Sequence, residues 1–187
     1  MHTLQWHSRA EKAPEICRHC KKGGMEQSFV SSGLFRVNAN RHTLDVWLIH
    51  RCTICGRSWK MEIHERVCPR DLAPEALHGY QVNDAALAWR CAHDQTLLVN
   101  NRAVAYYANV PITIDGPAID MQALAAPVTI ELMAEIALPI RVARILREKL
   151  SLSTAALKRL VEEGRIECPG VDVRKARLAP GMQVILY

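Results

Sequence analysis

Two cysteine pairs of the form C-x2-C constrain this 187-residue chain more than any other feature of its sequence. The first pair, Cys17 and Cys20, lies in "ICRHCKKGG", and the second pair, Cys52 and Cys55, lies in "HRCTICGRSW". A C-x2-C turn can direct both sulfurs at one ion, and two such turns supply the four thiolates that structural zinc prefers. Gly56 follows the second pair and suits the positive φ that such a turn often needs. We therefore expect one structural Zn²⁺ held by four cysteines.

A redox couple is the alternative function for these pairs. A thioredoxin-type couple stands at the N-terminus of a helix after a strand, whereas both pairs in this sequence lead into turns. Three nearby histidines could in principle replace a cysteine ligand, although we expect them to be exposed or hydrogen-bonded: His19, His50 and His64. The remaining cysteines have no partner two residues away and are predicted to be small buried hydrophobic residues: Cys68, Cys91 and Cys168.

The 31 residues between the two pairs have the pattern of a β-sheet. Leu44, Val46 and Leu48 recur at the period of two that a half-buried strand requires. Residues 38–41 suit a hairpin tip because Asn tolerates left-handed backbone, and a further strand is predicted in "SWKMEIHERV", residues 58–67. Three antiparallel strands that carry a thiolate turn at one end have the plan of a zinc ribbon. The expected fold class is therefore α+β, with a zinc-ribbon-like sheet and helices followed by a small C-terminal α+β domain.

Composition and pattern divide the chain into four segments. These are a zinc-ribbon-like module (1–70), a helical segment packed with it (71–102), a connector with short strands (103–138) and a last small module (139–187). Lys and Arg outnumber Asp and Glu by 12 to 6 in residues 1–70 and by 10 to 5 in residues 141–187, whereas acids prevail by 8 to 2 between them. Basic segments attract polyanions, nucleic acid first. Alternatively, the acidic middle docks against its basic neighbours within one molecule.

The last module contains two predicted amphipathic helices. In the first, Arg141, Arg144 and Arg147 lie opposite an apolar arc formed by Val142, Ile145, Leu146 and Leu150. Ser151 or Ser153 is the expected cap of the second helix, and Gly164 its expected end. The basic arc is either a solvated helix face or a surface for phosphate groups, to which guanidinium offers paired donors.

This module resembles the small RNA-binding domain of ribosomal protein S-four type, also called the alpha-L motif. The resemblance rests on Arg141, Leu146, Ser153, "LKRLVEEGRI" (157–166), Gly170 and "LAPGMQVI" (178–185). In that family the basic faces of the two helices contact structured RNA. The resemblance implies RNA contacts for Arg141, Arg144, Lys158, Arg159 and Arg165. The sequence departs from the pattern at Ala143, Thr154 and Pro169, where the family usually has Asp, Arg and Asn.

The front of the chain carries a second resemblance. The segments "FRVNAN" and "LDVWLI" and the cysteines resemble an uncharacterised bacterial family, domain of unknown function 1062, over about residues 5–105. This resemblance implies no function, and it agrees with a zinc-held β-sheet followed by helices.

We expect a zinc-stabilised, non-catalytic accessory protein that binds structured RNA, either rRNA or tRNA. No secretory signal and no apolar run of about 18 residues is present, so we expect a cytoplasmic protein with reduced cysteines and no membrane partner. A protein-interaction adapter is one alternative. An RNA-modifying enzyme is another, but no set of catalytic side chains can be assembled from the sequence. Basic residues beside the cysteines would either offset the thiolate charge or contact RNA: Lys21, Lys22, Arg51 and Arg57.

Overall fold

The computed structural model describes residues 2–20, 25–136, 138–179 and 181–187. The chain divides into two compact units. The terminal unit consists of Met1–Glu11 together with Pro111–Tyr187, and the cysteine unit consists of Lys12–Val110. Each unit contains a five-stranded sheet and helices, which confirms the α+β class.

The sheet of the cysteine unit has the strand order β5-β4-β3-β2-β6, and every neighbouring pair is antiparallel. Its strands are β2 (Glu15–Cys20), β3 (Met25–Asn40), β4 (Thr43–Cys52), β5 (Ser58–Val67) and β6 (Val104–Tyr106). The strand predicted from Leu44, Val46 and Leu48 corresponds to β4, and the strand predicted over residues 58–67 corresponds to β5. β3 is the third strand of the expected antiparallel set. The hairpin turn follows Asn40, and Arg41 adopts left-handed backbone with φ 55°.

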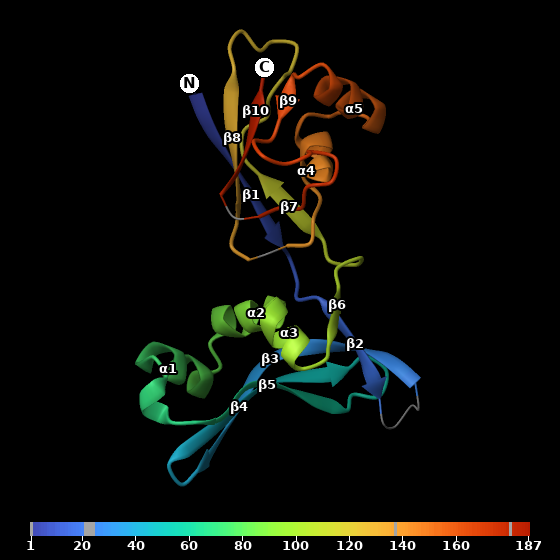
Figure 1. Ribbon diagram of the computed structural model, residues 1–187. Helices are drawn as coiled ribbons and strands as arrows, with labels where there is room; N and C mark the ends of the chain where they lie inside the picture. Colours follow the sequence, from blue (N-terminus) through green and yellow to red (C-terminus); the bar gives the residue numbers. More distant parts are fainter. Residues whose placement is uncertain (1, 21–24, 137, 180) are drawn as a thin grey trace. The chain divides into compact units, whose positions relative to one another are not determined.

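Three helices cover one face of this sheet (Figure 1). After the short 3₁₀ helix η1 (Pro69–Asp71) come α1 (Pro74–Val82), α2 (Ala85–His93) and α3 (Gln95–Asn100). Asp84 caps α2, because its Oδ1 accepts a hydrogen bond of 2.6 Å from the Leu87 N–H. The helical segment predicted for residues 71–102 is therefore present.

The core of the cysteine unit lies between this sheet and the helices. Val46, Leu48 and Met61 are fully buried on the sheet side. They belong to one hydrophobic cluster with Tyr80 of α1 and the buried residue Leu98 of α3. The helical segment thus packs on the sheet through apolar side chains.

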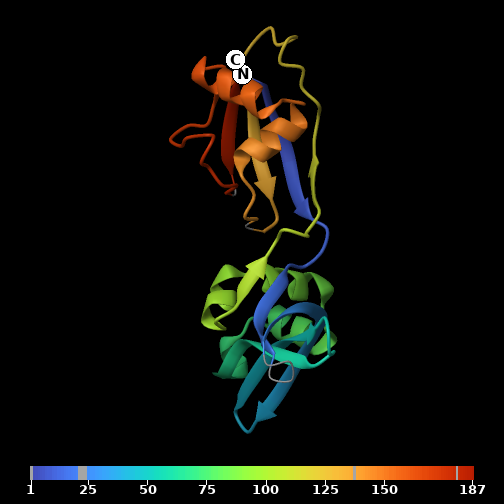
Figure 2. The ribbon, with the colours of Figure 1, turned by 90° about the vertical axis from the view of Figure 1, so that its right-hand side faces the viewer.

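The sheet of the terminal unit has the strand order β7-β1-β8-β10-β9. Its strands are β1 (His2–Ala10), β7 (Ile112–Asp115), β8 (Val128–Ala134), β9 (Ile166–Glu167) and β10 (Met182–Leu186). Figure 2 shows α4 (Val142–Lys149) and α5 (Thr154–Glu162) in front of these strands. Of the two predicted caps, Ser151 and Ser153, it is Ser153 that caps α5, by accepting a hydrogen bond from the Ala156 N–H. None of the helices in the described residues is long and apolar enough to cross a membrane.

The two units do not follow the four segments expected from the sequence. β1 lies in the terminal unit, where it pairs in parallel with β8, although both its residues and the cysteines were assigned to one module. The expected connector 103–138 is divided, since β6 joins the cysteine unit and β7 and β8 join the terminal unit. The reason is that strands far apart in sequence pair through long-range contacts, which local patterns do not contain.

Candidate functional site

The second cysteine pair forms a tight turn at the end of β4. Cys52 is the last residue of that strand, and its carbonyl accepts a hydrogen bond of 3.0 Å from the Gly56 N–H. The Cys52 N–H in turn donates to the Arg57 carbonyl at 2.9 Å. Gly56 has φ 68°, the positive value expected from the sequence. This turn brings the two residues of the pair, Cys52 and Cys55, to one side.

The first cysteine pair lies within a strand instead of a turn. Cys17 and Cys20 both belong to β2 and pair with Ser28 and Met25 of β3. Side chains three residues apart in a strand point to opposite faces. Cys20 is accordingly buried at 2% exposure on the core side, whereas the Cys17 sulfur lies 3.5 Å from an oxygen of Glu26. Partial desolvation and the Glu26 carboxylate raise the pKa of Cys17.

Three of the four predicted ligands come together. The sulfurs of Cys20, Cys52 and Cys55 lie within 4.8 Å of one another, and those of Cys20 and Cys55 are 3.7 Å apart. A tetrahedral zinc site with Zn–S bonds of about 2.3 Å separates its sulfurs by about 3.8 Å. Three thiols at this spacing could hold a metal ion.

The position of Cys17 differs from the prediction of a four-cysteine set. Among the residues that the structure describes, the group of three sulfurs does not include it. The physical reason is the strand alternation of β2, which directs Cys17 to the face opposite Cys20. None of the seven cysteines forms a disulfide.

The pKa of Cys55, beside the candidate metal position, lies above its ordinary value. The hydrogen bond to the Arg57 backbone lowers this pKa, but Cys52, desolvation and Cys20 together raise it. A metal ion bound at this position would displace the thiol protons, because the thiolate is the ligand.

The three histidines near the cysteine pairs lie outside the group of three sulfurs. His19 is exposed, and the Nε2 of His64 lies 3.2 Å from the hydroxyl of Tyr80. His50 is fully buried, its Nδ1 lies 3.4 Å from the Leu48 carbonyl, and burial lowers its pKa to about 4. The Nε2 of His50 has no hydrogen-bond partner among the described residues. Of the cysteines outside the pairs, Cys91 and Cys168 are buried as predicted, whereas Cys68 is only half-buried.

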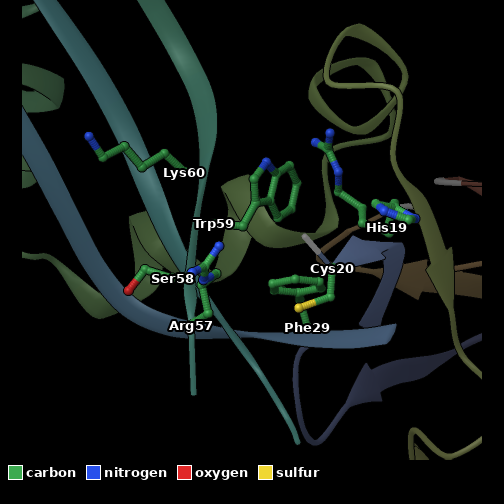
Figure 3. A pocket seen from close by; sticks show the side chains of 8 residues that line it. His19, Cys20, Phe29, Arg57, Ser58, Trp59 and Lys60 are labelled. Carbon is green, nitrogen blue, oxygen red and sulfur yellow. The ribbon is translucent and has the colours of Figure 1, made fainter. Parts of the chain in front are cut away.

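A cavity of about 380 Å³ opens beside Cys20. Figure 3 shows its walls, which include Phe29 of β3 and Trp59 of β5. Two arginines, Arg18 and Arg57, also line it. The cavity therefore combines aromatic walls with positive charge next to the cysteine group.

Three of the five basic residues predicted to contact RNA interact with other residues of the terminal unit. Lys158 and Arg159 on α5 form exposed ion pairs of 3.7 Å with Glu162 and Glu163, and such surface pairs contribute little to stability. Arg165 donates hydrogen bonds from Nε and Nη2 to the Tyr187 carbonyl and from Nη2 to the Met121 carbonyl, so its guanidinium holds the chain end.

Arg141 and Arg144 remain exposed at the start of α4. The structure adds Arg177, which sequence reasoning missed, because Arg141 and Arg177 face each other in an isolated antiparallel bridge. The hydrogen bonds that flank this bridge, Val142 N–H to Ala176 O at 3.0 Å and Leu178 N–H to Ile140 O at 2.8 Å, mark it as a non-hydrogen-bonded pair. The sequence signal for Arg177 is the basic run "VRKAR" at residues 173–177.

The chain was compared with models of known protein families, with curated proteins and with solved structures. The family described as protein of unknown function (DUF1062) matches residues 37–171, more than half of the chain. The chain belongs to the DUF1062 family. No curated protein and no solved structure matched.

The DUF1062 match begins and ends later than the resemblance expected over residues 5–105. It contains the second cysteine pair and both helices of the terminal unit, including Arg141 and Arg144. The first cysteine pair and Arg177 lie outside it.

Proposed function

We propose that the protein is a zinc-stabilised, non-catalytic accessory protein that binds structured RNA, either rRNA or tRNA, through the terminal unit. The observation that carries this proposal is the facing pair Arg141 and Arg177, with Arg144 one turn further along α4. We call these three residues the arginine cluster.

The arginine cluster is a surface that a polyanion would stabilise. Directly opposed residues of a non-hydrogen-bonded pair have Cβ atoms about 4.5–5.5 Å apart, and side chains of like charge in directly opposed positions destabilise the pair. All three side chains are exposed, and no ion pair involves them among the described residues. Phosphate groups are suited to this place, because guanidinium binds them with paired, charge-assisted hydrogen bonds.

The cysteine group supports the zinc part of the proposal. Cys20, Cys52 and Cys55 would hold the ion, which when bound supplies a cross-link between β2 and the turn after β4 and adds folding free energy. A four-thiolate site has a formal charge of −2. Arg57 and Arg51 are exposed beside the cysteines and would offset that charge.

Cys17 is the fourth ligand in this proposal. It has the same spacing from Cys20 that Cys52 has from Cys55, and structural zinc is almost always four-coordinate. To join the site, the end of β2 would exchange its pairing with β3 for the turn that the second pair already forms. That exchange costs strand hydrogen bonds, so Cys17 contributes less to affinity than the other three.

A protein-interaction adapter is the second candidate. The strand β6 lies at an edge of the cysteine-unit sheet, and its residues Val104 and Tyr106 are 58% and 54% exposed. An edge strand with exposed apolar side chains can pair with a strand of another chain.

Binding of a tRNA transcript and of an rRNA junction fragment, measured by fluorescence anisotropy, tests the RNA proposal. We expect affinity to fall steeply between about 50 and 200 mM salt, because phosphate contacts release counterions. The double variant Arg141→Glu/Arg177→Glu should weaken binding about tenfold or more. The control Arg70→Glu/Arg90→Glu makes the same charge change at exposed residues of the cysteine unit and should bind like the natural chain. If the Arg141→Glu/Arg177→Glu variant and the control variant bind RNA with equal affinity, the RNA proposal is refuted and the adapter is favoured.

A further inference from the structure

The cavity beside Cys20 has the composition of an anion site. Its volume is about 380 Å³, and its lining residues include Arg18, Arg57 and Ser58. None of the described residues that line it is acidic. Binding pockets for small ligands usually have volumes of this order and contain a few polar groups against apolar walls.

Arg18 is held in place at this cavity before any ligand arrives. Its guanidinium carbon lies 4.3 Å from the centre of the Trp59 ring, and its Nη1 donates a hydrogen bond of 3.0 Å to the Asn101 carbonyl. A guanidinium group has five N–H donors, so further donors remain for an anion. Because the side chain is already ordered, binding would cost little conformational entropy.

Arg57 provides a second positive charge in the lining of the cavity. The turn after β4 positions it, since its carbonyl accepts the Cys52 N–H. Figure 3 shows Arg57 next to Ser58, and Phe29 and Trp59 form the apolar side. The ring centres of Phe29 and Trp59 are 6.2 Å apart in an edge-to-face arrangement. Lys60 also touches the cavity, but its Nζ lies over the ring of Trp47.

We propose that this cavity binds the phosphate group of a nucleotide, at the 5′ end of an RNA or free in solution. Arg18 and Arg57 donate to the phosphate oxygens, and the Phe29–Trp59 wall contacts the sugar or the base. This assignment rests on the proposed RNA-binding function and adds a second, separate contact in the cysteine unit. Charge-assisted hydrogen bonds from arginine are the strongest that a protein offers to phosphate.

A competing explanation gives the arginines a different task. Arg57 could serve only to offset the thiolate charge of the cysteine group. Arg51 is the matched control, because it is also exposed, also adjoins Cys52 and does not line the cavity.

Calorimetry on the metal-free chain, in which Arg18 has the contacts described above, tests the ligand with four probes: 5′-phosphorylated hexauridylate, the same RNA with a 5′-hydroxyl, uridine monophosphate and inorganic phosphate. We expect the phosphorylated RNA to bind about tenfold tighter than the hydroxyl form. Binding of uridine monophosphate alone would identify a free nucleotide as the ligand. If the phosphorylated and hydroxyl RNAs bind equally and uridine monophosphate does not bind, the proposal is overturned. If inorganic phosphate binds as tightly as uridine monophosphate, the assignment of a nucleotide as the ligand is overturned.

Arg57→Gln should weaken binding of the preferred probe about tenfold, whereas Arg51→Gln should leave probe binding unchanged. Both variants should change zinc affinity to the same extent, because both arginines offset the thiolate charge. Unchanged probe binding in Arg57→Gln, or equal weakening of probe binding in Arg51→Gln, would overturn the proposal. The tRNA affinity of the same preparation reports separately on the arginine cluster, so failure at the cavity and failure of the proposed function are distinguishable.

Discussion

The two cysteine pairs share one spacing and have different backbones. Cys52 and Cys55 span a turn that starts at the end of β4 and contains two backbone hydrogen bonds and a glycine with positive φ. Cys17 and Cys20 lie in β2, which pairs with β3 at both cysteines and with β6 at Cys17 only. The C-x2-C spacing therefore permits a metal-binding turn but does not produce one. Strand pairing holds the same spacing extended.

This difference in backbone predicts that the two cysteine pairs would contribute unequally to the free energy of metal binding. The second pair is already in the conformation that a metal site needs, so its contribution carries little cost of rearrangement. The first pair has one ligand in place, Cys20, and one on the other face, Cys17.

The largest effect is expected from the second pair. Cys52→Ser/Cys55→Ser should reduce zinc from one ion per chain to a trace and destabilise the cysteine unit by several kcal/mol, because binding free energy of structural zinc is folding free energy. Elemental analysis and thermal unfolding measure both quantities. Cys68→Ser, a half-buried cysteine outside the pairs, is the control. Full zinc content in the double variant would contradict the proposed site.

A smaller effect is expected from Cys17→Ser. This variant should still bind one metal ion, with affinity reduced by about tenfold, because three thiolates remain and the strand β2 no longer has to rearrange. Cobalt substitution gives the readout, since its thiolate charge-transfer absorption decreases when one thiolate is lost. An unchanged cobalt spectrum would show that Cys17 is not a ligand. Cys20→Ser, at the buried member of the same pair, should lose the metal almost completely.

The smallest effect is expected from the backbone of the turn. Gly56→Ala and Gly33→Ala both place a methyl group at positive φ, 68° and 72°, with nothing within 4 Å of the new carbon. Each should lower the free energy of unfolding by about 1–2 kcal/mol through backbone strain. Only Gly56→Ala should also weaken metal affinity, by less than about tenfold, because opening the turn relieves its strain. Equal metal affinity in the two variants would show that the turn is not preformed.

Local patterns in the sequence predicted most of the individual elements. The alternation of Leu44, Val46 and Leu48 marked β4, and Ser153 marked the start of α5, because both depend on residues a few positions apart. The place of β1 was not predictable in this way, since its partners β7 and β8 lie more than a hundred residues later. The facing pair Arg141 and Arg177 was missed for the same reason.

By itself, the sequence determined the kinds of groups that are present: four thiols at metal-binding spacing, a basic helix face and two amphipathic helices. Only the tertiary structure decided which of these groups meet. The pairing of β2 placed Cys20 beside the second cysteine pair and Cys17 on the opposite face, and the bridge to residue 177 concentrated charge at the start of α4. The physical reason is that side-chain direction in a strand depends on its register with its neighbours, and register is a long-range property.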